Sequence, residues 1–131
     1  MKPSTPSREA RAAAADMVAM LDSSFLRALT DSSRLEVLRV LMLEGTSNIA
    51  ALAEHLPQDR SVISRHLKAL EDAGIVKSEW KGRERFFSLD GERFVSTLEQ
   101  IAVRARAQMM RCCPPAPEVV PASALRKKRK E

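Results

Sequence analysis

The hydrophobic period of the chain changes twice, and this constrains the fold more than any other feature. Up to Gly74 the apolar residues recur at three- and four-residue steps, which is typical of amphipathic helices. From Ile75 to Leu89 they alternate with polar residues across a turn at 81–83, which predicts a β-hairpin. From Gly91 the helical period returns. The sequence therefore predicts a mainly α-helical fold that contains one β-hairpin.

The segment before the hairpin divides into five short helices, because residues that cap or stop a helix recur along it. The expected caps and stops, in chain order, are Ser7, Asp31, Gly45, Pro57, Asp59 and Gly74. With one helix after the hairpin, the predicted order is α-α-α-α-α-β-β-α. Apolar spacing in the third helix predicts a buried face made of Leu35, Leu38, Val40 and Leu41.

One folded domain is expected, since 131 residues are enough for one hydrophobic core and few for two. Residues 1–7 carry two prolines and three hydroxyl residues, which predicts a disordered leader. Residues 8–111 form the predicted domain, and residues 112–131 hold a cysteine pair followed by a disordered tail that is proline-rich and then basic. The absence of an apolar stretch of about 20 residues predicts a soluble, cytoplasmic protein without a membrane partner.

The position of the positive charge is more informative than its amount. The chain has 22 Lys and Arg against 17 Asp and Glu, a formal net charge of +5. Five of these cations lie in the last six residues, RKKRKE, so the remainder is close to neutral. The excess fits a polyanion, nucleic acid before an anionic membrane. An enzyme is not expected, because neither histidine has a visible nucleophile partner and no Gly-rich phosphate loop occurs.

Two short helices joined by the turn at 57–60 and followed by a basic hairpin are the parts of a winged helix-turn-helix. Small polar and cationic residues on the second helix can enter the major groove of double-stranded DNA, and the hairpin can reach a neighbouring phosphate. A winged helix used for protein or RNA contact is the alternative. The predicted DNA-binding residues are Arg60, Ser61, Ser64, Arg65, Lys68, Lys81, Arg83 and Arg85.

The segments LTDSSRLEVLRVL and SVISRHLKALEDAGIVKSEWKGRERFFSL resemble the pattern of the ArsR/SmtB family of transcriptional repressors, over roughly Phe25 to Leu98. The resemblance implies a homodimer, paired through its first and last helices, that binds an inverted-repeat operator and releases it on sensing an inducer. An apolar stripe on the last helix independently favours a dimer. The family positions of the recognition helix fall on Arg60, Ser61, Ser64, Arg65 and His66, and those of the wing on Arg83 and Arg85.

Several side chains near this site have a second interpretation. His66 either contacts a phosphate or is a packed histidine, and the sequence does not decide between the two. The aromatic residues of the hairpin, Trp80, Phe86 and Phe87, are interpreted as hairpin packing, with stacking on bases as the alternative.

The metal sites usual in this family lack their ligands here, since 46–50 reads TSNIA and the last helix has no histidine. The adjacent Cys112 and Cys113 remain, and Pro114 is expected to push Cys113 out of the helix so that both sulfurs converge. Nearby arginines would lower the thiol pKa, while the negative end of the helix dipole opposes this lowering. Two thiolates suit a thiophilic ion, and similar pairs in arsenical-responsive relatives favour a trivalent arsenical as inducer. Thiol oxidation and a pair that senses nothing are the alternatives; no cofactor is required.

Overall fold

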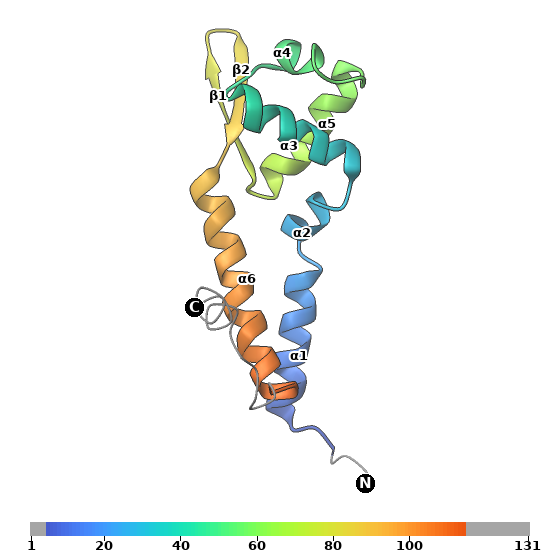
Figure 1. The fold of residues 1–131 in the computed structure, drawn as a ribbon, viewed down its shortest axis with the longest axis vertical. Helices are drawn as coiled ribbons and strands as arrows, with labels where there is room; N and C mark the ends of the chain where they lie inside the picture. Colours follow the sequence, from blue (N-terminus) through green and yellow to red (C-terminus); the bar gives the residue numbers. More distant parts are fainter. Residues whose placement is uncertain (1–4, 115–131) are drawn as a thin grey trace, which may run out of the picture.

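A computed structural model describes residues 5–114, and in it the elements follow the predicted order (Figure 1). The mainly helical fold with one hairpin is confirmed. Residues 1–4 and 115–131, which hold most of the predicted leader and tail, lie outside the described residues. The helices are α1 (Arg8–Leu21), α2 (Ser24–Ala28), α3 (Ser32–Glu44), α4 (Ile49–Ala53), α5 (Arg60–Asp72) and α6 (Gly91–Cys112), and the strands are β1 (Val76–Lys81) and β2 (Glu84–Leu89).

The molecule has two parts, which we call the body and the arm. The body, residues 24–89, contains α2 to α5 and the hairpin, which we call the wing. The arm consists of α1 and α6, which lie side by side and extend away from the body (Figure 1). Within the described residues, no helix combines the length and the apolar character needed to cross a bilayer.

The buried apolar residues all belong to the body. On α3 the prediction was wrong at Leu35, which is 42% exposed, whereas Val37 is fully buried. At 3.6 residues per turn these two positions lie about 160° apart around the helix, so they cannot share one face. The buried residues are Phe25, Ala28, Val37, Leu38, Val40, Leu41, Leu52, Leu56, Ile63, Leu67, Leu70, Ile75, Val76 and Phe87.

Two of the three predicted N-caps make the expected hydrogen bonds. The Ser7 hydroxyl accepts from the Ala10 amide at 3.1 Å, and the Asp31 carboxylate accepts from the amides of Ser33 and Arg34 at 2.9 and 3.3 Å. Asp59 occupies the N-cap position of α5 without a side-chain cap hydrogen bond, so its predicted capping role was wrong. The backbone amides of the first turn of α5 therefore receive no hydrogen bond from this side chain.

The wing is attached to the body by a backbone bridge that the sequence did not predict. β1 and β2 pair antiparallel from Val76 with Leu89 to Lys81 with Glu84. Ser47, between α3 and α4, exchanges two hydrogen bonds with Phe87 of β2, with N–O distances of 2.9 and 2.8 Å. This reciprocal pair fixes the base of the wing beside the helices of the body.

Candidate nucleic-acid interface

Helix α5 has one face in the core and one face in solvent. Ile63, Leu67 and Leu70 recur at four- and three-residue steps and are fully buried, which fixes the helix on the body. Among the exposed residues, Lys68 forms a 3.5 Å ion pair with Asp72, one turn further along. The sequence-predicted residues on the exposed surface of the helix are Arg60, Ser61, Ser64, Arg65 and Lys68.

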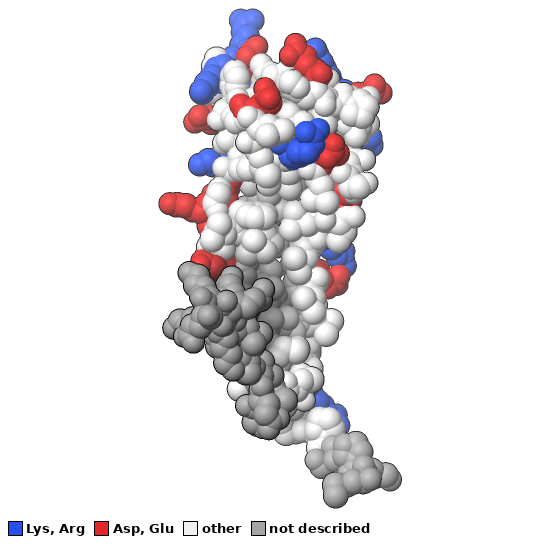
Figure 2. Space-filling view, viewed as in Figure 1, with Lys and Arg blue, Asp and Glu red and all other residues white. Residues whose placement is uncertain are grey.

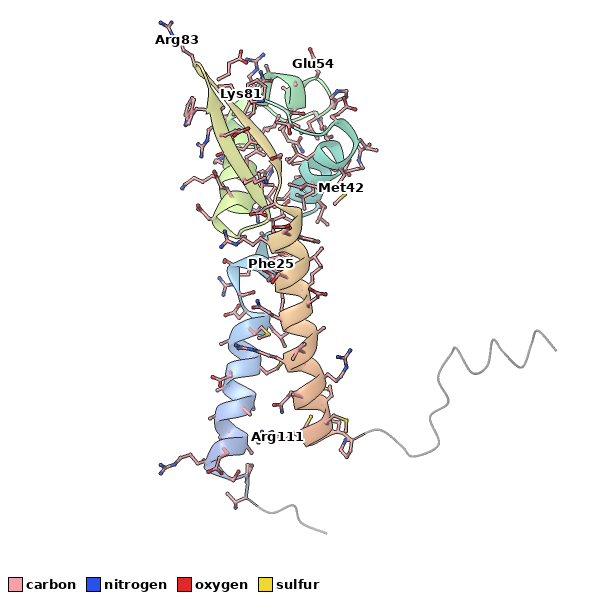
Figure 3. The ribbon with its side chains drawn as sticks, turned by 90° about the vertical axis from the view of Figure 1, so that its left-hand side faces the viewer. Phe25, Met42, Glu54, Lys81, Arg83 and Arg111 are labelled. Carbon is pink, nitrogen blue, oxygen red and sulfur yellow. The ribbon has the colours of Figure 1, made fainter. Side chains whose placement is uncertain are left out.

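The tip of the wing presents two of the predicted cations. Gly82 and Arg83 connect the strands, and Gly82 has a φ of 66°, which glycine adopts without a steric penalty. Figure 3 shows Arg83 as the outermost side chain of the wing. The Lys81 amine lies 5.2 Å above the ring of Phe86. In Figure 2 most charged side chains gather at the end of the molecule that carries α5 and the wing, and the visible part of the arm is mostly uncharged.

The third predicted wing cation, Arg85, is held by partners within the body. Its Nη2 donates to Glu71 Oε1 of α5 at 2.8 Å, and its Nε donates to the Ser78 hydroxyl of β1 at 2.9 Å. The Ser78 hydroxyl in turn donates to Glu71 Oε2 at 2.6 Å. Sequence reasoning missed Glu71, because only the folded chain brings residues 71, 78 and 85 together.

The half-buried His66 lies on α5 close to the N-terminus of α3. The pKa of Asp31 is held below its ordinary value by the backbone N–H of Arg34 first, then by that of Ser33, and by the positive charges of His66 and Arg34. His66 thus lies near the carboxylate that caps α3. Its contact with a phosphate stays a prediction.

The aromatic residues of the wing have different environments. Phe87 is buried at 4% exposure and packs in the core of the body, beyond the hairpin packing that was predicted. Trp80 is 66% exposed, so it is not packed in the core. Instead, the guanidinium of Arg85 lies 5.8 Å from the centre of the Trp80 ring and 5.3 Å from that of Phe87. Both rings thus contribute to holding Arg85.

The cysteine pair lies at the far end of the arm. Cys112 ends α6, and Cys113 leaves the helix with φ −143° and ψ 65°, so the two sulfurs converge to 3.0 Å as expected. Both residues are exposed. The hydrogen bond to Cys112 and its charge raise the pKa of Cys113, so the arginines do not lower it overall. Among residues 5–114, no group of three or more His, Cys, Asp and Glu side chains is placed to hold a metal ion.

The chain is similar to known regulators over the helices of the body. Residues 31–78 match a family described as "Bacterial regulatory protein, arsR family". The chain is 32% identical over 74 residues to the arsenical resistance operon repressor of Bacillus subtilis (strain 168), covering 56% of this chain and 70% of that protein. It is 30% identical over 80 residues to a cadmium resistance transcriptional regulatory protein CadC homolog of Staphylococcus aureus, covering 61% and 66%. The match therefore spans about two thirds of these relatives.

Solved structures agree with the sequence matches. An ArsR-like transcriptional regulator from Rhodococcus sp. RHA1 is similar with a TM-score of 0.56 and 31% identity, over 76% of this chain and 97% of that one. The matched proteins are described as regulators and not as enzymes. The family match covers α3, α4, α5 and the start of β1, and it ends at Ser78. The arm and its cysteine pair lie outside that family match.

Proposed function

Because this chain belongs to the ArsR family of transcriptional regulators, we propose that it is a repressor that binds an inverted-repeat DNA operator as a homodimer. The observation that carries the proposal is the exposed polar and cationic face of α5, which lies beside a basic wing on a shared core. Arg side chains can pair with guanine edges in the major groove, and small hydroxyl residues allow the helix to approach the bases. Arg83 at the wing tip reaches a neighbouring phosphate or the minor groove.

The two half-sites of an inverted repeat require two copies of the chain, related by a two-fold axis. The arm offers the surface for this pairing, because none of the described residues of α1 or α6 is buried. An exposed apolar surface of this extent is unusual for a monomer and is typical of an interface. The exposed apolar residues of the arm are Val18, Leu21, Val95, Leu98, Val103, Met109 and Met110.

The inducer that we propose is a thiophilic species, with a trivalent arsenical favoured, bound by Cys112 and Cys113. The converging sulfurs support this assignment, and so do relatives whose names refer to arsenical and cadmium resistance. As each S–As bond forms, the thiol proton and a hydroxide from arsenic would leave together as water. Two sulfurs match a methylated arsenical with two exchangeable positions; inorganic arsenite would need a third ligand. Reduced thiols at this site fit a cytoplasmic protein.

The experiment is fluorescence anisotropy on a duplex from the protein's own promoter region, in reducing buffer and over a range of salt concentrations. We expect tight binding that weakens steeply with salt, because phosphate contacts release counterions. Arg65→Ala and Arg83→Ala are expected to weaken binding. If duplex affinity is weak and independent of salt, the repressor assignment is wrong.

The inducer is tested on the same duplex with arsenite and with a methylated trivalent arsenical. The wild type is expected to release the DNA, and Cys112→Ser combined with Cys113→Ser is expected to retain it. The control is Met110→Leu, which changes an exposed side chain near the pair and leaves both cysteine sulfurs in place. Tight binding that ignores both compounds would refute the arsenical assignment and leave the repressor assignment intact, with oxidants as the next compounds to test.

A further inference from the structure

Glu71, Ser78 and Arg85 form a closed hydrogen-bonded group, which we call the brace. Its members come from three elements, with Glu71 on α5, Ser78 on β1 and Arg85 on β2. Both carboxylate oxygens of Glu71 accept a hydrogen bond, one from Ser78 and one from Arg85, while Arg85 also donates to Ser78. The three distances lie between 2.6 and 2.9 Å. The brace thus links the recognition helix to both strands of the wing.

Additional contacts restrict the orientation of the Arg85 side chain. Its guanidinium lies within 6 Å of the centres of the Trp80 and Phe87 rings, and Trp80 is its direct partner across the two strands. Arg85 is 42% exposed and Glu71 is 30% exposed, so water screens the pair only in part. A planar guanidinium that is bound to a carboxylate and a hydroxyl and contacts two rings has few alternative positions.

The brace lies between the fixed base of the wing and its projecting tip. The backbone bridge between Ser47 and Phe87 fixes the base of the wing, whereas the tip at Arg83 projects away from the body (Figure 3). Between α5 and the wing lies a groove of about 370 Å³ lined by Ser64, Lys68, Glu71, Asp72, Arg85 and Phe87. Across this groove, the brace provides a hydrogen-bonded side-chain link from α5 to the wing.

The charge of Glu71 also needs an explanation. A carboxylate beside a DNA-binding face repels phosphates, and on electrostatic grounds alone it would weaken binding. Here the carboxylate holds a cation that would otherwise be available to DNA. Because Arg85 is bound to Glu71, it is not available for a phosphate contact, and instead it helps to define the distance between α5 and the wing tip.

We propose that Glu71 and Ser78 are positioning residues that hold Arg85, and through it the wing, at a fixed angle to the recognition helix, so that Arg83 and α5 engage DNA together. This inference rests on the proposed function. It assigns Arg85 to the brace and leaves the phosphate contact of the wing to Lys81 and Arg83. Pre-organisation of this kind lowers the entropy that a flexible wing would lose on binding.

The first experiment measures duplex affinity for Ser78→Ala, Arg83→Ala and the double variant. Ser78→Ala changes no charge but removes two of the three hydrogen bonds of the brace, and we expect about fivefold weaker binding, within the effect of one or two hydrogen bonds. In the Arg83→Ala background the same change is expected to have a clearly smaller effect, since one of the two wing cations that the brace positions is then absent. Ser88→Ala, on the neighbouring strand and outside the brace, is the matched control. Equal losses in both backgrounds would overturn the inference.

Glu71→Gln distinguishes the brace from simple charge repulsion, because the two explanations predict opposite changes in DNA affinity. Removing a negative charge strengthens binding if Glu71 only repels DNA or masks a phosphate contact of Arg85. If the brace positions the wing, Glu71→Gln weakens binding, because the ion pair to Arg85 is lost. Stronger binding by this variant would therefore refute the proposal.

A measurement without DNA keeps the brace testable even if the proposed function fails. The amide order parameters of Gly82 and Arg83, obtained by NMR relaxation, report fast motion of the wing tip. We expect them to fall in Ser78→Ala and to stay unchanged in Ser88→Ala. Unchanged order parameters in Ser78→Ala would overturn the brace, whereas weak, salt-independent binding of DNA by the wild type would overturn only the proposed function.

Discussion

The body and the arm of this molecule are stabilised in different ways. The body encloses every buried apolar side chain of the described residues, from Phe25 to Phe87, and the arm encloses none. Yet the arm is built from long helices with regular apolar spacing, and α6 spans Gly91–Cys112. The comparison indicates that the core lies within the body, whereas the arm leaves its apolar surface exposed and is the surface that we propose for dimerisation.

The largest expected effect comes from the core of the body. Leu67→Ala removes a fully buried side chain of α5, and we expect a loss of about 2–5 kcal/mol in the free energy of unfolding, because a cavity remains. Chemical denaturation measured at several protein concentrations checks this. If the free energy of unfolding falls by less than about 0.5 kcal/mol, the Leu67 side chain does not stabilise the body as expected.

The arm is tested by a charge placed on its exposed surface. Val103 is 62% exposed, so Val103→Asp is expected to change the folding of a single chain little. In a dimer the carboxylate would be buried, and we expect at least about a thirtyfold rise in the dimer dissociation constant, the effect of losing roughly 2 kcal/mol at an interface. Sedimentation equilibrium measures it. Leu43→Asp, with a side chain 69% exposed on α3 of the body, is the control expected to keep the dimer.

The junction between body and arm is predicted to be sensitive at one glycine. Gly74 has a φ of 79°, and an added Cβ would lie 2.5 Å from Nε of Arg93 on α6. Gly74→Ala is therefore expected to lower the free energy of unfolding by about 1–2 kcal/mol, mainly through the left-handed conformation. Thermal unfolding checks this, with Gly91→Ala as control, since nothing lies within 4 Å of a Cβ at Gly91. Equal stability of the two variants would contradict the prediction.

The smallest expected effect is a difference between the helix caps of the body and the arm in how their contribution to stability depends on pH. The lowered pKa of Asp31 means that its cap stabilises the body above the ordinary pKa of aspartate, and this contribution is lost as the pH falls through the lowered value. Asp31→Asn keeps a capping side chain but does not titrate. We expect the wild type to lose more stability than this variant when the pH falls below about 4. Ser7→Ala, which removes the arm cap, is expected to leave the pH dependence of the wild type unchanged.

The same division decides how much of the molecule could be predicted from its sequence. Element order, the wing and the caps at Ser7 and Asp31 depend on local periodicity and local hydrogen bonds, so the sequence contains them. The buried face of α3 was partly wrong, because its neighbours decide whether Leu35 or Val37 faces the core. The partners of Arg85 were missed for a related reason. Pairing over 14 residues depends on the docking of the wing against α5.

The candidate DNA-binding residues were predictable as a group, since exposed cations on α5 and a basic wing tip follow from the amphipathic pattern. Their individual roles were not. The sequence gives no signal that Arg85 is bound by Glu71, or that His66 lies half-buried near the cap of α3. Convergence of the two cysteine sulfurs was predictable, because Pro114 restricts the residue before it.

The reciprocal hydrogen bonds between Ser47 and Phe87 have a consequence for amide hydrogen exchange. The amides of both residues are donors in that bridge, and Ser47 is 6% exposed. Neither can exchange with solvent until the strand separates from the segment between α3 and α4. The amides at the wing tip, Gly82 and Arg83, lie outside the bridge and are expected to exchange rapidly. The amides at the base of the wing are therefore expected to exchange slowly, only when the base separates from the helices. The amides at the tip are expected to exchange independently of that separation.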